Sequence, residues 1–344
     1  MSKILITGGC GFIGTNAAAH FAKQGWEVHA LDNFSRPGSR ENATFLRAEA
    51  PAVTIVEMDI VSGKDAATAY IRDGAFDAII HAAAQVAVTS SVTDPLFDFN
   101  TNALGTLIVL DAARMCEKKP IVLFTSTNKV YGDLQHVMIK EDATRYQFPE
   151  LPQGIPETMP LDFHSPYGCS KGAADQYTRD WQRIYDVPTI VFRQSCIYGA
   201  HQFGVVDQGW VAYLTMLAAF GKPITIFGDG KQVRDLLYMD DLARAMEAAI
   251  TKIDITKGKI YNIGGGAMNT SSLLEFVELL RSKLNSPIET GFSDWRPGDQ
   301  KVYISDIRNA EADFGWKPEV TLEEGFSRMH QWIADNRGML ETYL

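Results

Sequence analysis

Through its first half, the chain alternates short, apolar, β-branched runs with helical stretches. Helical patterns are expected at Gly14–Gln24, from about Pro95 to Glu117 and from about Tyr167 to Tyr185. Because a strand followed by a helix returns to its sheet through a right-handed crossover, this alternation predicts an α/β fold with a doubly wound parallel sheet of the Rossmann type. The runs with strand character span residues 3–7, 27–31, 54–58, 78–81, 121–126 and 189–193.

After about Ile197 the pattern loosens, and Gly, Asp and Pro separate shorter elements. We expect a smaller, mixed α/β C-terminal domain for the substrate, built from about residues 197–234 and 266–344. The NAD-binding Rossmann domain then comprises residues 1–196 and about 235–265, and the chain re-enters the sheet at 236–239 and 260–263. Residues 146–160 hold several prolines and few periodic apolar residues, which predicts a loop insertion that covers a site.

Size, charge and cysteine spacing restrict the class of protein further. The 344 residues are 46% hydrophobic and carry a net charge of −10, which disfavours nucleic-acid binding. Met1 leads directly into a strand, and no apolar run reaches the roughly 20 residues of a membrane helix, so we expect neither a signal peptide nor a membrane partner. Cys10, Cys116, Cys169 and Cys196 form no CxxC pair, so free thiols, no metal site and a cytoplasmic location are expected.

Three glycines, Gly8, Gly11 and Gly14, follow the first strand and open the first helix. Such a turn lets the backbone approach a pyrophosphate at the helix N-terminus. Asp32 ends the second strand, where a carboxylate accepts the adenosine ribose hydroxyls and repels a 2′-phosphate, so NAD is favoured over NADP. The alternatives are an aspartate that only caps a loop, and a phosphate held by the nearby arginines at positions 36 and 40. The other contacts predicted for NAD at this end are Phe12, Ile13, Asn33, Asp59 and Ile60.

Tyr167 and Lys171 are four residues apart and therefore lie on one face of the expected helix. A phenolate at Tyr167 can take the proton of a hydroxyl while hydride leaves the same carbon. The ordinary pKa of a phenol, about 10, is too high for this, so Lys171 is expected to lower it and to hold the nicotinamide ribose. Thr127, at the end of a strand, is expected to orient the substrate hydroxyl.

Taken together, these motifs resemble the extended short-chain dehydrogenase/reductase family over nearly the whole chain. The runs His81–Ala84 and Asn102–Thr106 are similar to the cofactor-side motifs of that family, and the resemblance adds Ala82 and Asn102 to the cofactor contacts. It implies an enzyme that acts on a nucleotide-sugar as an epimerase, dehydratase, decarboxylase or reductase. It also implies a homodimer that pairs through the two long helices.

The residues after Thr127 discriminate among these reactions. The 4,6-dehydratases of the family carry Asp-Glu there, whereas this chain has Asn128 and Lys129, so dehydration is disfavoured. A reductase would consume NADPH, whereas Asp32 favours NAD, so a reductase is also disfavoured. What remains is epimerisation, in which tightly held NAD oxidises and then re-reduces one carbon.

Several runs of the second half resemble the CDP-paratose (CDP-tyvelose) 2-epimerases. They are residues 201–204, 207–212, 228–235 and 295–301. Cys196 also stands where the commoner 4-epimerases usually have an asparagine. A CDP-hexose is therefore the favoured substrate and a UDP-hexose a possible one. The alternatives are a UDP-hexose or UDP-uronate 4-epimerase, a reductase or decarboxylase, and a non-enzymatic NAD-binding protein.

Arg234 and Arg296 are expected to grip the diphosphate by charge-assisted hydrogen bonds. The alternative is that each pairs with a neighbouring carboxylate, Asp235 or Asp299. Lys129 is expected to reach a phosphate or the sugar, unless it is a solvated loop lysine. The remaining residues expected to bind substrate are Thr127, Asn128, His201 and Gln202.

Overall fold

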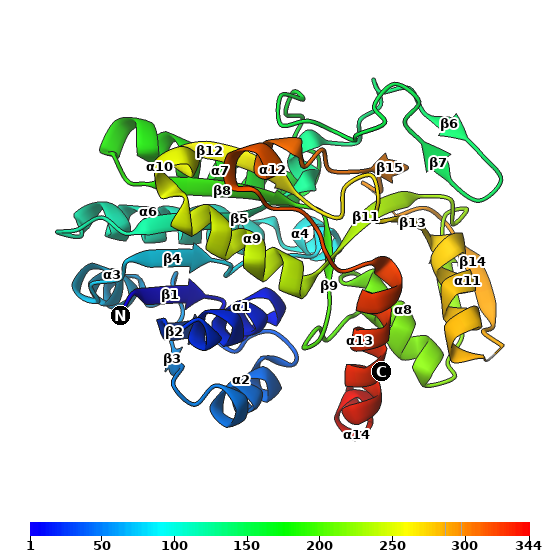
Figure 1. Cartoon of the computed structure of the whole chain (residues 1–344), viewed down its shortest axis with the longest axis horizontal. Coiled ribbons are helices and arrows are strands. Elements are labelled where there is room, and N and C mark those ends of the chain that lie inside the picture. The colour runs from blue at the N-terminus through cyan, green and yellow to red at the C-terminus, as the bar shows by residue number, and fades with distance from the viewer. Residues whose placement is uncertain (286, 297) are drawn as a thin grey trace.

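A seven-stranded parallel sheet forms the centre of the molecule, and Figure 1 shows its strands one below another. The computed structural model describes residues 1–285, 287–296 and 298–344. The predicted α/β class and parallel sheet are confirmed. In spatial order the strands are β12 (Lys259–Ile263), β8 (Thr189–Gln194), β5 (Ile121–Thr127), β4 (Ala78–His81), β1 (Lys3–Thr7), β2 (Glu27–Asp32) and β3 (Thr54–Glu57).

Both faces of this sheet are covered, so its central strands are largely apolar rather than alternating. Along β1, Ile4 and Ile6 belong to the core on one face, whereas Leu5 belongs to the core on the other. The helices over the first face are α1 (Phe12–Lys23), α2 (Ser39–Glu49), α9 (Met239–Thr251) and α12 (Arg308–Phe314). Those over the second face are α3 (Lys64–Asp73), α6 (Gly105–Met115) and α7 (Ser165–Tyr185).

The long helix expected from about Pro95 to Glu117 is built from three consecutive segments. These are α5 (Pro95–Phe99), the wider π-helical turn η1 (Asn100–Leu104) and α6. A π turn inside a helix often marks a functional position, because it re-aims the side chains around it. The neighbouring short helices are α4 (Val88–Thr93) before α5 and α10 (Ile253–Thr256) after α9.

The strand expected to return to the central sheet at residues 236–239 does not do so. It is β11 (Val233–Tyr238), which joins a separate small sheet with β9 (Cys196–Tyr198), β13 (Thr270–Ser272) and β15 (Val302–Tyr303). Leu236 and Tyr238 pack into the core of that second region, whereas Leu237 packs into the core over the first face of the central sheet. The expected return at residues 260–263 is confirmed by β12.

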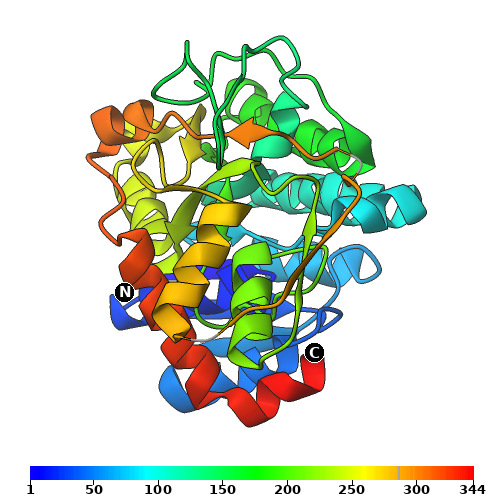
Figure 2. The ribbon, with the colours of Figure 1, turned by 90° about the vertical axis from the view of Figure 1, so that its right-hand side faces the viewer.

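Three helices surround the core of the second region, as seen from the side in Figure 2. They are α8 (Trp210–Ala219), α11 (Leu273–Leu284) and α13 (Leu322–Asp335). However, Ala310 and Phe314 of α12 pack on the central sheet, although they fall within the residues expected in the second domain. The proposed division into two domains stays a prediction. The remaining elements of this region are β10 (Ile224–Phe227), β14 (Thr290–Ser293), α14 (Arg337–Leu340) and η3 (Glu341–Tyr343).

The proline-containing insertion at residues 146–160 packs beside the small sheet. It begins with β7 (Tyr146–Gln147), which pairs with β6 (Lys140–Glu141), and the N–H of Ile155 donates to the carbonyl of Ile304 at 2.7 Å. Among the described residues, none of this segment lines the large cavity next to Tyr167. Residues 157–160 line a second cavity instead, and the expectation that the insertion covers a site stays a prediction.

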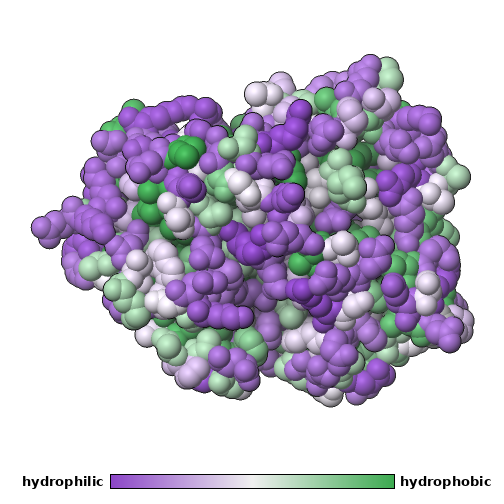
Figure 3. Space-filling model, in the orientation of Figure 1, coloured by the Kyte–Doolittle hydropathy of each residue, from purple (hydrophilic) through white to green (hydrophobic). Residues whose placement is uncertain are grey.

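The surface on the side of Figure 1 is mostly hydrophilic, with small hydrophobic spots between the polar residues, as Figure 3 shows. Within the described part of the chain, no helix combines the length and the apolar character that crossing a bilayer requires.

Candidate active site

The turn between β1 and α1 is too tight for side chains. Gly8 has a φ of +66°, and a Cβ added at Gly14 would overlap the carbonyl oxygen of Gly8. Helix α1 begins at Phe12, and its first turn carries neither an acidic residue nor a side-chain cap. The free N–H groups and the positive helix end around Phe12 and Ile13 therefore suit the pyrophosphate of a dinucleotide.

Asp32 lies at the carboxyl end of β2, beside this turn. Its carboxylate accepts the backbone N–H groups of Cys10 at 3.0 Å and Phe34 at 2.8 Å. Burial raises the pKa of Asp32, while these backbone hydrogen bonds act against the rise. Each carboxylate oxygen still has acceptor capacity, so the residue fits the two hydroxyls of an adenosine ribose.

The two arginines that left a 2′-phosphate possible are engaged elsewhere. Arg36 donates to the side chain of Gln208 at 2.9 Å, and Arg40 lies 3.3 Å from the carboxylate of Glu57. Within the described part of the chain, neither arginine forms a hydrogen bond or an ion pair with Asp32. Their positions favour a ribose with a free 2′-hydroxyl, as NAD has.

Asn33 and Asp59 meet at the ends of neighbouring strands. The amide of Asn33 donates to Asp59 at 2.6 Å, and Asp59 also accepts the N–H groups of Val61 and Ser62. Burial raises the pKa of Asp59, but these hydrogen bonds outweigh it, so the net shift is downward. Ile60 is buried in the core over the second face of the sheet, which leaves the edge formed by Asn33 and Asp59 for the adenine.

Ala82 and Asn102 lie on the opposite side of the glycine turn. Gly8 is so close to Ala83 that a Cβ on Gly8 would come within 2.8 Å of the Cα of Ala83. Asn102, in the π turn η1, is nearly inaccessible and holds the backbone of Gln85 from both sides, at 2.9 and 3.0 Å. The predicted cofactor residues therefore gather around the carboxyl ends of β1, β2 and β4.

Thr127, Tyr167 and Lys171 come together as predicted. Thr127 is the last residue of β5, and its side chain interacts with the Tyr167 hydroxyl. Lys171, one helical turn after Tyr167, donates from Nζ to the carbonyl of Thr125 at 2.6 Å. All three side chains are almost completely buried.

The protonation states differ from the expected ones. Burial raises the pKa of Tyr167 to about 12, and the hydrogen bond with Thr127 acts against this rise. Burial lowers the pKa of Lys171 to about 7, opposed by the charges of Asp175 and Asp98. The lowering of the Tyr167 pKa by Lys171 is thus not a feature of this structure, because the ammonium group faces the carbonyl of Thr125.

Three charged residues around this pair were missed by the sequence analysis. Arg193 and Asp175 form a buried bidentate ion pair with both contacts at 2.9 Å, and Asp98 lies buried beside Ser170. Asp175 follows Lys171 by four residues, so its helical spacing was a usable signal. No comparable signal pointed to Asp98, which reaches the site from a different helix.

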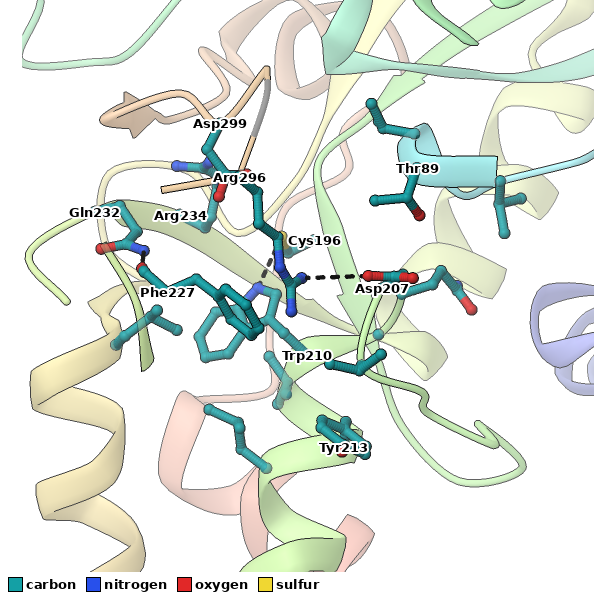
Figure 4. A pocket seen from close by; sticks show the side chains of 18 of the residues that line it. Thr89, Cys196, Asp207, Trp210, Tyr213, Phe227, Gln232, Arg234, Arg296 and Asp299 are labelled. Atoms are coloured by element: carbon teal, nitrogen blue, oxygen red, sulfur yellow. Dashed lines mark hydrogen bonds and ion pairs between the residues drawn. The ribbon is translucent and has the colours of Figure 1, made fainter. Parts of the chain in front are cut away.

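A cavity of about 440 Å³ begins at Thr127 and Tyr167 and extends between the two regions (Figure 4). Its far end is lined by apolar side chains of α8 and β10, including Trp210 and Phe227. The size and the mixture of an apolar end with a few charged groups suit a small ligand.

Three cations predicted for the substrate line this cavity: Lys129, Arg234 and Arg296. Lys129 donates to the carbonyl of Gly298 at 2.9 Å, and burial followed by the charge of Arg234 lowers its pKa to about 8. Because this lysine and arginine repel each other, an anionic group between them would stabilise both. That arrangement fits a diphosphate.

The two arginines are held weakly by the protein itself. Arg234 donates to the carbonyl of Val233, and Arg296 lies 3.7 Å over the ring of Phe227. Arg296 also points toward Asp207 at 4.0 Å, as Figure 4 shows, rather than pairing with Asp299 as the alternative assumed. This distance is the upper limit for an ion pair, so a phosphate can replace Asp207 as the partner of Arg296.

The remaining predicted substrate residues separate into two groups. Asn128 and Gln202 line the cavity, and Asn128 donates to the side chain of Gln300 at 3.1 Å. His201 does not line it, because its ring packs between Phe45 and Trp332, with centroid distances of 3.9 and 5.4 Å. The described residues contain no cluster of three or more metal-ligating side chains.

Comparison with known proteins agrees with this geometry. The model of the family described as GDP-mannose 4,6 dehydratase matches residues 5–329, and the chain belongs to this family. The resemblance to extended short-chain dehydrogenases/reductases is thereby confirmed. A CDP-paratose 2-epimerase from Salmonella typhi is 40% identical over 340 residues, which cover 96% of this chain and 99% of the relative.

Two solved structures with NAD bound are similar over nearly the whole chain. A UDP-glucuronic acid 4-epimerase from Bacillus cereus, in complex with UDP-glucuronic acid and NAD, is 25% identical with a TM-score of 0.82, covering 97% of this chain and 99% of that one. A dTDP-glucose 4,6-dehydratase from Streptomyces venezuelae with NAD and TYD bound is 26% identical with a TM-score of 0.84, covering 99% of this chain and 100% of that one. NAD as the cofactor is thereby confirmed.

Proposed function

We propose that this protein is an NAD-dependent nucleotide-sugar epimerase and that it inverts C2 of a CDP-hexose. The observation that carries this proposal is the position after Thr127. A dehydratase needs an acid and a base there, whereas Asn128 is a buried amide bonded to Gln300. The relative of 40% identity, a CDP-paratose 2-epimerase, supports the cytidine nucleotide and the carbon.

The residues of the cavity divide the work of such a reaction. NAD supplies the acceptor and then the donor of the hydride. Tyr167 takes the proton of the sugar hydroxyl and later returns it to the keto oxygen, so the enzyme and the cofactor end as they began. Thr127 orients that oxygen, while Arg234, Arg296 and Lys129 hold the diphosphate. The sugar turns about its phosphate bonds between the two hydride transfers.

The proposed reaction requires Tyr167 to become a phenolate while NAD and the sugar nucleotide are bound. Its pKa of about 12 arises from burial, and Thr127 is the neighbour that favours the phenolate. A positively charged nicotinamide in the predicted position would act in the same direction. Lys171 fits the role of holding the nicotinamide ribose.

The test is to incubate the purified protein with CDP-paratose and CDP-tyvelose and, separately, with UDP-hexoses and UDP-uronic acids. Proton NMR identifies the inverted carbon, and absorbance at 340 nm measures any net NADH. We expect inversion at C2 of the CDP-sugar, without net NADH and with a C2 deuterium label retained. Inversion at C4 of a UDP-sugar would establish the second candidate, which the solved UDP-glucuronic acid 4-epimerase favours. A net change in NADH, in either direction, would instead indicate a reductase or decarboxylase.

We further propose a homodimer that pairs through α5, α6 and α7. These helices contact one another and expose large apolar side chains, among them Leu96 at 74%, Phe99 at 53% and Ile184 at 64%. A patch of this kind on a folded chain indicates an interface. Sedimentation equilibrium tests it: Leu96→Glu and Ile184→Glu should give monomers, and Met268→Glu, at an equally exposed but distant position, should not.

A further inference from the structure

Asp98 is a buried carboxylate close to Tyr167 and Lys171 that the proposed reaction does not yet use. It lies on α5 with no exposed surface. Gln85 donates to it at 2.8 Å, Asn102 at 3.1 Å and Ser170 at 2.5 Å. All three donors are neutral, so none of them compensates the charge of the carboxylate.

The second carboxylate near Lys171 is in a different situation. Asp175 forms the bidentate pair with Arg193 and also accepts from Ser126 at 2.8 Å. Its charge is already paired with a guanidinium, although it still raises the pKa of Lys171, ahead of Asp98. A buried charge without such a partner is costly, so the positive group that balances Asp98 has to come from elsewhere.

The groups that face Lys171 leave one candidate for that balance. From β4 comes His81, which is neutral because burial and the charge of Lys171 lower its pKa to about 3. From β8 comes Arg193, which is bound to Asp175, and from α7 itself come Asp175 and Tyr167. Beneath the ammonium group lies the ring of Phe124, at 4.2 Å. Among the described residues, neither Asp98 nor Lys171 forms a close ion pair of its own, and each acts on the pKa of the other.

We propose that Asp98 is a positioning residue that balances the charge of Lys171 and fixes the helix of Tyr167 against α5 through Ser170. Ser170 adjoins Lys171 in α7 and donates to Asp98. The carboxylate therefore places a negative charge near Lys171 and also fixes the position of this turn of α7 relative to α5. The inference deepens the proposed function and rests on it for the roles of Tyr167 and Lys171.

Two titrations should respond to Asp98. Its charge raises the pKa of Lys171, against the lowering by burial, and it raises the pKa of Tyr167 as a secondary cause after burial. Replacing the carboxylate by an amide removes both effects and lowers both values. The active form, with Lys171 charged and Tyr167 able to accept a proton, then moves to lower pH.

The test compares Asp98→Asn with Asp94→Asn in the full-length enzyme. Asparagine keeps the shape of Asp98 and can accept from Gln85, and Asp94 is an exposed carboxylate on the same helix, where it accepts from the N–H of Phe97 at 2.9 Å. The pH profile of kcat/KM is measured on whichever nucleotide-sugar the wild type converts. In Asp98→Asn we expect the whole profile to shift by about one pH unit to lower pH, so that activity on its acid side, below about pH 6, rises about tenfold relative to the wild type while activity near pH 8 changes little. Asp94→Asn should keep the wild-type profile.

A second measurement does not depend on turnover and therefore separates this inference from the proposed function. Lysine labelled with ¹³C at Cε is titrated by NMR, and the Lys171 signal is assigned by its absence in Lys171→Met. In Asp98→Asn the pKa of Lys171 should fall by about one unit. An unchanged pKa of Lys171, or an equal loss of activity at every pH, would overturn the proposal. A shifted pKa in a protein that converts no sugar nucleotide would overturn only the proposed reaction.

Discussion

The side chains at the two ends of the active-site cavity differ in how firmly the protein itself holds them. At the end with Tyr167, the polar side chains lie at the ends of buried strands and bond to the protein, as Lys171 does to Thr125. At the other end, Arg234 and Arg296 rest on a carbonyl and an aromatic ring, with one carboxylate at 4.0 Å. The groups proposed for chemistry are fixed in advance, and those proposed for binding remain available to a ligand. The difference predicts that substitutions at one end change kcat and those at the other end change KM.

The largest effect is expected for Tyr167→Phe. The substitution removes the proposed acid and base but keeps the ring, so kcat should fall by about 10²- to 10⁴-fold while nucleotide binding persists. Tyr177→Phe, at an exposed position of the same helix, is the control and should leave kcat unchanged. Steady-state kinetics and calorimetric binding of CDP measure the two properties. Near-normal turnover in Tyr167→Phe would show that Tyr167 is not the acid and base, and that the two ends of the cavity do not differ as proposed.

The next effect is expected for Arg234→Met and Arg296→Met. A charge-assisted hydrogen bond contributes about 1.5–3 kcal/mol, so KM should rise about 10- to 100-fold for each variant, with a smaller change in kcat. Lysine at either position should recover part of the loss, because it keeps the charge but not the planar fork. Arg328→Met, which removes an exposed ion pair on α13, is the control. A fall in kcat without a change in KM would show that the two ends are not functionally distinct.

A moderate effect on stability is expected at the buried His81. Burial and the charge of Lys171 lower its pKa to about 3, whereas the unfolded chain takes up this proton near pH 6.5. The unfolding free energy should therefore fall as pH drops from about 6.5 to 3, by at most about 1.4 kcal/mol per pH unit from this group. Urea unfolding at several pH values measures this slope. It should be smaller in His81→Gln and unchanged in His136→Gln, where the histidine is exposed.

The smallest effect is expected for His201→Asn. The histidine packs between Phe45 and Trp332 and does not line the cavity, so KM should change by less than about twofold. Asparagine tolerates the φ of +65° at this position, and the loss of packing should cost about 1 kcal/mol of stability. Kinetics and urea unfolding separate the two effects. A KM raised about tenfold or more would show that His201 does bind the substrate.

Local sequence patterns were sufficient for the features that depend on neighbours in the chain. The glycine turn, Asp32 at the strand end and the four-residue spacing of Tyr167 and Lys171 all lie within short segments, and the structure brings each to the predicted place. The strand at 233–238 was misplaced because its apolar residues fit either sheet, and only its pairing with β9, β13 and β15 distinguishes them. His201 was wrongly assigned to the substrate site, because the local sequence of a loop histidine does not show which aromatic rings will pack against it.

The sequence by itself determined the class of fold and the dinucleotide turn, and it predicted which residues form the proposed proton-transfer pair, because backbone conformation and helical periodicity are local properties. Only the tertiary structure decided which charges surround that pair. Asp98 and Lys171 are far apart in the sequence and come close because α5 packs on α7, and Asp175 is neutralised by an arginine from β8. Electrostatic interactions depend on distance in space and on burial, so the protonation of Tyr167 and Lys171 could not follow from their spacing alone.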